Sequence, residues 1–309
     1  MVSKTLFLKH LGLCTVIASL ALAASARAQG FRDDKSTPAH NAVVNLGHCS
    51  GTMISNSVIL TAAHCLPRGW RQPAPEGAGT NCTSFPDQNR VAGSPHRSEA
   101  DWQPIARPPG TALPRVSVTA TIGRREFQTT LTHYAIPACA DIALLRTFQI
   151  TPATIATPMA VLTGPIAAGD TPFFSVESAS LSYAGWGRTE DFPQGQSRRQ
   201  TAEVGYWARN RCFIFALPPR RTPGGPRIIS GDSGSPLIME TSTGRLVAGV
   251  LFGSGLPDPE NCDPPRPPLA EPTAIYTPTY RGKIGQTDAT DLGAWLRRLV
   301  PEANHRTMP

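Results

Sequence analysis

The most informative stretch of this chain is a serine in a glycine-rich turn. Ser233 lies in the segment GDSGSP, where two glycines and a proline favour a tight turn that holds the hydroxyl clear of the backbone. A serine hydroxyl is a weak nucleophile at neutral pH, so catalysis by it requires a general base and a carboxylate that orients the base. Ser233 is a candidate nucleophile if the chain supplies both.

Two other segments supply them. His64 stands in the segment TAAHC, directly after the apolar run VIL. Asp141 opens the segment DIALL, whose apolar residues are typical of a buried strand that would hold a carboxylate rigidly. Asp101 has no such neighbours, so Asp141 is the better candidate for the orienting carboxylate.

The segments TAAHC, DIALL and GDSGSP, in this order, resemble the trypsin/chymotrypsin-like serine endopeptidases, and the likeness extends from about Val43 to Val300. The resemblance implies an all-β fold of two antiparallel six-stranded barrels, with the active site in the cleft between them and a C-terminal helix. Many short Val/Ile/Leu/Thr runs between prolines and glycines also favour an all-β fold.

The same resemblance implies the chemistry. His64 would take the proton of Ser233 as the hydroxyl attacks a peptide carbonyl, and Asp141 would fix the imidazole tautomer. The backbone N–H groups of Gly231 and Ser233 would form the oxyanion hole. The expected activity is hydrolysis of peptide or protein substrates through an acyl-enzyme, with no metal ion and no organic cofactor.

Substrate binding is also carried over from the family. The strand Leu251, Phe252 and Gly253 is expected to pair with the backbone of a bound peptide. Gly253 and Ala274 would line the specificity pocket. Arg227 stands where enzymes that select Lys or Arg carry an aspartate, so cleavage is not expected to favour basic residues.

Residues 1–28 have the features of a secretory signal peptide. Lys4 and Lys9 precede an apolar run, and Ala26-Arg27-Ala28 has the small-x-small form of a signal-peptidase site. Cleavage after Ala28 would send the chain to the periplasm or the medium, and an uncleaved membrane anchor is the alternative.

The rest of the chain is expected to form a polar N-terminal arm, residues 29–42, and one protease domain, residues 43–309. The two barrels would span about 43–150 and about 173–300. Residues 67–114 are rich in proline, glycine and polar residues and are expected to be an irregular insertion, in which His96, Asp101 and Trp102 are exposed loop residues. Leu292, Trp295, Leu296 and Leu299 have helical spacing, which predicts a helix that packs against the second barrel.

Charge says little about partners. Loss of Lys4, Lys9 and Arg27 with the leader would lower the formal net charge from +7 to +4. Without a clustered Lys/Arg run with interleaved aromatic residues, the sequence does not favour a nucleic-acid partner. No second apolar stretch of membrane-spanning length follows the leader, and a monomer is expected.

Six cysteines would remain after Cys14 leaves with the leader, an even number that suits an oxidising compartment. The resemblance implies a Cys49–Cys65 bridge beside the candidate base. Cys212 and Cys262 each look like half of a family bridge whose other half is missing, so they are expected to pair, which leaves Cys82 with Cys139.

Activation and activity leave alternatives open. Trypsin-like enzymes pair the aspartate before the nucleophile, here Asp232, with a newly cut Ile or Val terminus, but no Arg-Ile-Val-Gly-Gly sequence precedes Cys49. Asp232 would then need another donor, and activity without such trimming is expected.

A catalytically inactive homologue that acts as a binding protein is one alternative. An esterase or acyltransferase is another, although a Gly-x-Ser-x-Gly elbow between a strand and a helix is missing.

Overall fold

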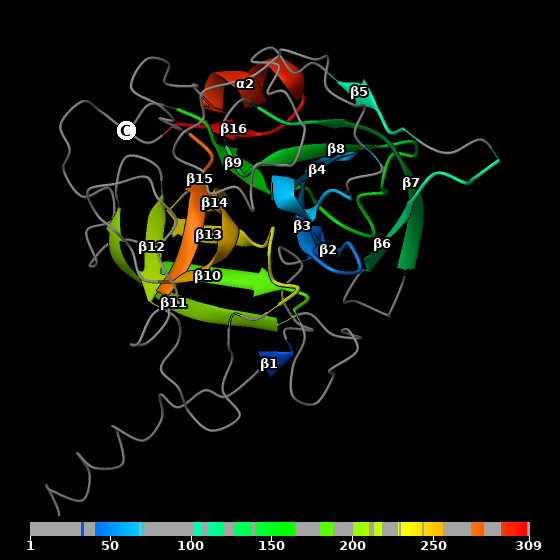
Figure 1. The fold of residues 1–309 in the computed structure, drawn as a ribbon. Helices are drawn as coiled ribbons and strands as arrows, with labels where there is room; N and C mark the ends of the chain where they lie inside the picture. The colour runs from blue at the N-terminus through cyan, green and yellow to red at the C-terminus, as the bar shows by residue number, and fades with distance from the viewer. Residues whose placement is uncertain are drawn as a thin grey trace, which may run out of the picture.

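The computed structural model describes segments of the chain that form two β-sheets and a C-terminal helix (Figure 1). The described residues are 32–33, 41–67, 70, 102–106, 110–119, 126–137, 140–164, 180–187, 200–209, 213–217, 228, 230–242, 244–255, 273–280 and 292–307. The expected signal peptide, residues 1–28, lies outside them.

The first sheet contains the strands next to His64 and Asp141. Its seven strands run in the order β5-β7-β6-β2-β3-β4-β8, all neighbours are antiparallel, and β7 also pairs with β8. The strands are β2 (Val43–Asn45), β3 (Ser50–Ser55), β4 (Val58–Thr61), β5 (Gln103–Pro104), β6 (Arg115–Thr119), β7 (Glu126–Ala135) and β8 (Ala143–Thr147). Every residue of β3 and β4 is buried, which explains why β4 is an unbroken apolar run ending in threonine.

The second sheet contains the strands on either side of the serine turn. It has nine strands, in the order β13-β10-β11-β12-β15-β14-β9-β16 with β1 beside β11, and β13 also pairs with β14. The strands are β1 (Arg32–Asp33), β9 (Ala160–Leu162), β10 (Ser180–Gly185), β11 (Gln200–Arg209), β12 (Ile214–Leu217), β13 (Pro236–Thr241), β14 (Gly244–Gly255), β15 (Thr273–Pro278) and β16 (His305–Arg306). The N-terminal arm is therefore not wholly irregular, because β1 adds a short antiparallel strand to β11.

One apolar cluster spans both sheets. It contains first-sheet residues such as Met53 and Leu144 and second-sheet residues such as Val161 and Ile238, whereas another cluster contains second-sheet residues such as Tyr276. All five side chains are fully buried. Burial on this scale fixes the register of each strand, because a one-residue slip would turn its apolar side chains toward solvent.

The helix α2 (Leu292–Leu299) follows the predicted pattern, and all four predicted apolar positions are buried. The helix residues Trp295 and Leu296 belong to an apolar cluster that contains residues of both sheets. Gly293 fits closely against the residue after β9, since a Cβ at position 293 would lie 1.9 Å from the carbonyl oxygen of Thr163.

Trp102 is not the exposed loop residue that the sequence predicts. Its indole is partly buried against the apolar cluster that spans both sheets. Its N–H donates to the carbonyl oxygen of Leu299 at 3.3 Å, and the Arg146 guanidinium lies 4.1 Å from the ring centroid. Trp102 thus ties the end of the insertion to α2, whereas His96 and Asp101 lie outside the described residues.

Among the described residues, no helix has the length and apolar character needed to cross a membrane.

Candidate active site

His64 and Asp141 are joined by two hydrogen bonds. The imidazole Nδ1 lies 2.7 Å from Asp141 Oδ2, and the backbone N–H of His64 donates to Asp141 Oδ1 at 2.8 Å. The Asp141 side chain is 2% exposed and that of His64 is 27% exposed. Both carboxylate oxygens are therefore engaged by one residue, while the imidazole reaches solvent.

The pairing of β4 with β8 brings these two residues together. The strands are antiparallel, with Thr61 opposite Ala143, so the end of β4 lies beside the start of β8. His64 follows β4 in a short 3-10 turn, η3 (Ala63–Cys65), and Asp141 lies two residues before the start of β8. The pairing of β4 with β8 thus brings the imidazole and the carboxylate together at the adjoining ends of the two strands.

Ser233 lies in a turn that requires glycine. Gly231 and Gly234 have φ values of +98° and +84°, in a region that residues other than glycine rarely adopt. A Cβ at position 234 would lie 2.1 Å from the carbonyl oxygen of Ser50 and 2.3 Å from Thr61 Oγ1. The turn is therefore packed against the end of β4, three residues before His64, and Ser233 itself is partly exposed.

Backbone hydrogen bonds also fix the turn to the second sheet. The N–H of Gly234 donates to the carbonyl oxygen of Leu251 at 2.9 Å, and the N–H of Leu251 donates to that of Ser235 at 2.8 Å. The N–H of Ser235 donates in turn to the carbonyl oxygen of Asp232 at 2.9 Å. The strand predicted to bind substrate is thus joined directly to the turn of the candidate nucleophile.

Asp232 is fully buried directly before Ser233. Its Oδ1 accepts a hydrogen bond from the backbone N–H of Gly187 at 2.7 Å. Two buried phenols, Tyr183 and Tyr276, interact with this carboxylate electrostatically. Burial, and then the negative charge of Asp232, raise the pKa of both phenols well above the usual tyrosine range, so both stay neutral at ordinary pH.

The structure places Phe252 next to the candidate base. Its ring centroid lies 6.1 Å from that of His64 in an edge-to-face arrangement and 5.5 Å from that of Phe213. Phe252 and Gly253 are partly exposed, and Leu251 is buried in the core of the second sheet. An apolar wall therefore borders the imidazole on the side of β14.

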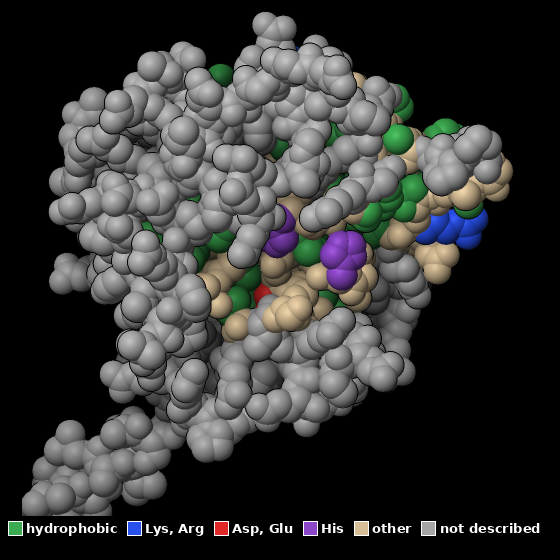
Figure 2. Space-filling view, viewed as in Figure 1, with side chains coloured by type: hydrophobic (Ala, Val, Ile, Leu, Met, Phe, Trp, Pro, Cys, Tyr) green, Lys and Arg blue, Asp and Glu red, His purple; other side chains and the backbone are tan. Residues whose placement is uncertain are grey.

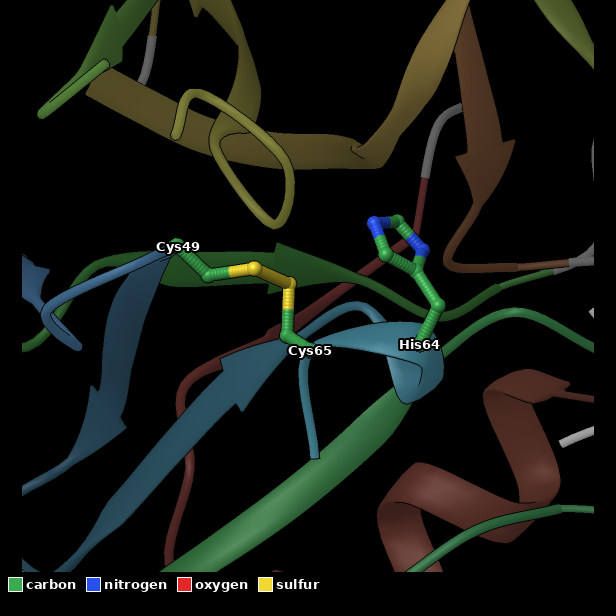
Figure 3. A group of neighbouring side chains, drawn as sticks. All are labelled: Cys49, His64 and Cys65. Carbon is green, nitrogen blue, oxygen red and sulfur yellow. A yellow bond between two sulfur atoms is a disulfide. The ribbon is translucent and has the colours of Figure 1, made fainter. Parts of the chain in front are cut away.

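The expected bridge between Cys49 and Cys65 is confirmed. Figure 3 shows Cys65 and His64 leaving the same helical turn, with the bridge and the imidazole projecting from it in different directions. Possible ligand atoms of these three residues lie within 4.8 Å of one another, but the two sulfur atoms are bonded to each other. Because thiolates and not disulfide sulfurs bind metal ions, this cluster is a covalent support for η3.

Histidine side chains reach the surface near the centre of the face shown in Figure 2. His48 is exposed, and its Nε2 lies 2.8 Å from the carbonyl oxygen of Cys65, which a ring N–H at this position can bind. This contact makes His48 a support for the turn that carries His64.

The other predicted site residues are placed only in part. Ala274 is buried in β15, opposite Ser254 of β14. Arg227 lies outside the described residues, as do Cys82, Cys139, Cys212 and Cys262.

Sequence reasoning did not assign a role to Ser50. Its hydroxyl accepts a hydrogen bond from the Trp186 N–H at 2.8 Å and donates one to the Gly231 carbonyl oxygen at 3.0 Å. The only signal in the sequence is a small polar residue in a fully buried strand.

Two comparisons relate the chain to known proteins. The family model described as Trypsin matches residues 29–93, which include His64 but neither Asp141 nor Ser233. The protein named "CLIP domain-containing serine protease B4" from Anopheles gambiae is 27% identical over 250 residues. That alignment covers 74% of this chain and 58% of the mosquito protein, so the chain spans less than two thirds of its relative.

Proposed function

Because this chain contains a trypsin-family serine protease domain and is a distant homologue of a CLIP domain serine protease, we propose that it is a serine endopeptidase that acts through Ser233, His64 and Asp141. The observation that carries the proposal is the pair of hydrogen bonds from His64 to the buried Asp141. This arrangement holds one ring nitrogen of the imidazole at the carboxylate, as a general base next to a serine nucleophile requires.

The proposed reaction has two halves. Ser233 Oγ attacks the peptide carbonyl while His64 takes its proton, and His64 then gives this proton to the leaving amine as the C–N bond breaks. A water molecule, deprotonated by His64, next attacks the carbonyl carbon of the acyl-enzyme. The ester C–O bond to Ser233 breaks, His64 returns the proton to Ser233 Oγ, and the acid product leaves. Asp141 stabilises the imidazolium that forms in both halves.

The negative charge on the tetrahedral intermediate would be stabilised by the N–H groups of Gly231 and Ser233. Each such donor is worth about 10²–10³ in rate where it has been measured in other enzymes. Gly231 has a positive φ, which glycine can adopt because it has no side chain. This backbone conformation supports the proposed role of its N–H group.

The peptide would bind as an added strand along Leu251, Phe252 and Gly253. Partial exposure of Phe252 and Gly253, and the edge-to-face contact of Phe252 with His64, support this placement. We further propose, from the sequence, that Arg227 disfavours basic residues before the scissile bond. Rapid cleavage after Arg that is unaffected by Arg227→Ala would refute that preference.

We also infer the larger organisation. Six strands of each sheet form a closed path of pairings, completed by β13–β14 in one sheet and by β7–β8 in the other, which supports two six-stranded barrels with the site between them. The leader pattern and the Cys49–Cys65 bridge support export to the periplasm or the medium. Peptide or protein substrates and a monomeric state complete the proposal.

The direct functional test is peptide-bond hydrolysis. Residues 29–309 are incubated with a mixed peptide library, next to a matched Ser233→Ala protein, and products are identified by mass spectrometry. We expect new peptide termini only with the parent. Turnover of a simple ester without any peptide cleavage would favour an esterase, and no turnover of either would favour an inactive homologue that acts by binding.

A further inference from the structure

Ser50 bonds the turn of the candidate nucleophile through both its backbone N–H and its hydroxyl. This residue is fully buried at the start of β3, in the sheet that carries His64. Its backbone N–H donates to the carbonyl oxygen of Ser233 at 2.7 Å. Its hydroxyl donates to the carbonyl oxygen of Gly231 at 3.0 Å. Its own carbonyl oxygen accepts from the Thr61 hydroxyl at 2.7 Å and packs against Gly234.

These contacts fix the peptide unit between them. The carbonyl groups of Gly231 and Ser233 belong to the peptide units on either side of the one that joins Asp232 to Ser233. The carbonyl oxygen of that middle unit accepts from the N–H of Ser235 at 2.9 Å. The described peptide bonds are all trans, so the Ser233 N–H points away from this carbonyl oxygen. Three hydrogen bonds therefore set the direction of the Ser233 N–H.

The hydroxyl also links the turn to a second element. It accepts a hydrogen bond from the backbone N–H of Trp186 at 2.8 Å, directly after β10 of the other sheet. The indole N–H of Trp186 donates to the carbonyl oxygen of Val43 at 3.0 Å, which returns to the first sheet. A single buried hydroxyl thus bridges Trp186 and Gly231, and loss of the hydroxyl would leave a donor and an acceptor without this partner.

We propose that Ser50 is a positioning residue for the oxyanion-binding N–H groups, acting through the turn Gly231–Gly234. The role rests on the proposed function, since it needs a developing oxyanion to serve. Ser50 would not touch substrate. Its hydroxyl would hold the turn in the geometry that stabilises the transition state, which affects the rate of acylation more than the binding of substrate.

Thr52 offers a matched control. It lies two residues further along β3, is also buried, and its hydroxyl has no hydrogen-bond partner among the described residues. Thr52→Val therefore removes a buried hydroxyl from the same strand without touching the turn. Comparison with Ser50→Ala separates loss of positioning from a general effect on the strand.

The test is the saturation kinetics of labelling by a fluorophosphonate, which forms a tetrahedral-like adduct with the active serine. The parent, Ser50→Ala and Thr52→Val are compared at equal concentrations of folded protein, determined by circular dichroism and thermal unfolding. We expect the limiting rate of Ser50→Ala to fall about tenfold with its half-saturation concentration unchanged, and Thr52→Val to react at the parent's rate. If Ser50→Ala does not fold, Ser50→Gly carries the same expectation.

The outcomes are separable. A reactive parent whose Ser50 variant has the parent's limiting rate would overturn the positioning role alone. The role is also refuted if Thr52→Val slows as much as Ser50→Ala, or if only the half-saturation concentration changes. An unreactive parent would overturn the proposed function and this role with it.

Discussion

The buried carboxylate of Asp232 accepts a hydrogen bond from the backbone N–H of Gly187, with 2.7 Å between the donor nitrogen and Oδ1. Gly187 is fitted closely to this carboxylate, because a Cβ at position 187 would lie 2.4 Å from Asp232 Cγ. The Asp232 carboxylate, which adjoins Ser233, thus has a hydrogen-bond donor within the intact chain, the N–H of Gly187. This donor is present without a terminus created by proteolysis.

We therefore predict activity without proteolytic trimming. Residues 29–309 should hydrolyse peptides with the Gln29 start intact, as verified by mass spectrometry of the same sample. Activity is measured before and after limited proteolysis of the N-terminal arm, with Ser233→Ala as the blank. Active sites that appear only after part of residues 29–45 is removed would mean a zymogen, and the role given to Gly187 would be wrong.

The two phenols near Asp232 predict a loss of stability at alkaline pH. Burial, followed by the charge of Asp232, raises the pKa of Tyr183 and Tyr276 in the folded protein. In the unfolded chain the two phenols ionise near pH 10, whereas in the folded protein they stay neutral to higher pH. Their contribution to the free energy of unfolding should therefore be constant below about pH 10 and should fall as the pH rises above it. Urea unfolding across this range measures the effect.

Replacing both phenols tests the assignment. Tyr183→Phe together with Tyr276→Phe should flatten the alkaline fall in stability, and phenolate absorbance of the folded parent should rise by less than its five tyrosines would give if all ionised. Full ionisation of all five in a protein that remains folded would contradict the burial of these two groups.

The His64–Asp141 contact predicts a specific kinetic defect. Asp141→Asn keeps the shape of the side chain but offers the imidazole an amide in place of a carboxylate, and kcat should fall about 10⁴-fold, as for the equivalent change in a related triad. A second single variant, Asp141→Ala, should show a similarly low kcat. A kcat within about tenfold of the parent for Asp141→Asn would exclude the orienting role.

The disulfide prediction concerns stability. Cys49 and Cys65 close a loop with a sequence separation of 16, and removal of this bridge by Cys49→Ala with Cys65→Ala should lower the free energy of unfolding by about 3 kcal/mol. Urea unfolding of the oxidised parent and the double variant gives the difference. An unchanged midpoint would show that the bridge does not stabilise the fold.

The remaining cysteines are tested separately by peptide mapping under non-reducing conditions. We predict links between Cys82 and Cys139 and between Cys212 and Cys262. A peptide that joins Cys82 to Cys212 or to Cys262 would refute this pairing.

The contact between His64 and Asp141 was predictable from the family resemblance. The apolar run beside each residue indicated a strand, but only the structure shows that the two runs pair as β4 and β8. The positions of α2 were also predictable, since helical spacing of apolar residues is a local signal.

The contacts that cross between segments were not predictable in this way. The packing of α2 on the apolar cluster that spans both sheets and the burial of Trp102 depend on tertiary arrangement. The bonds of Ser50 to Gly231, Ser233 and Trp186 join parts of the chain more than 130 residues apart. Periodicity says nothing about such distant partners, so a buried serine in a strand carried no functional signal by itself.

If Ser233 is an activated nucleophile, it should react covalently with a fluorophosphonate. The parent protein, residues 29–309, is treated with a fluorophosphonate, digested, and analysed by tandem mass spectrometry, next to Ser233→Ala and His64→Ala. We expect one adduct on Ser233 in the parent, none on the Ser233→Ala protein, and greatly slowed labelling of the His64→Ala protein. An unlabelled parent, or labelling on another serine that persists in Ser233→Ala, would contradict it.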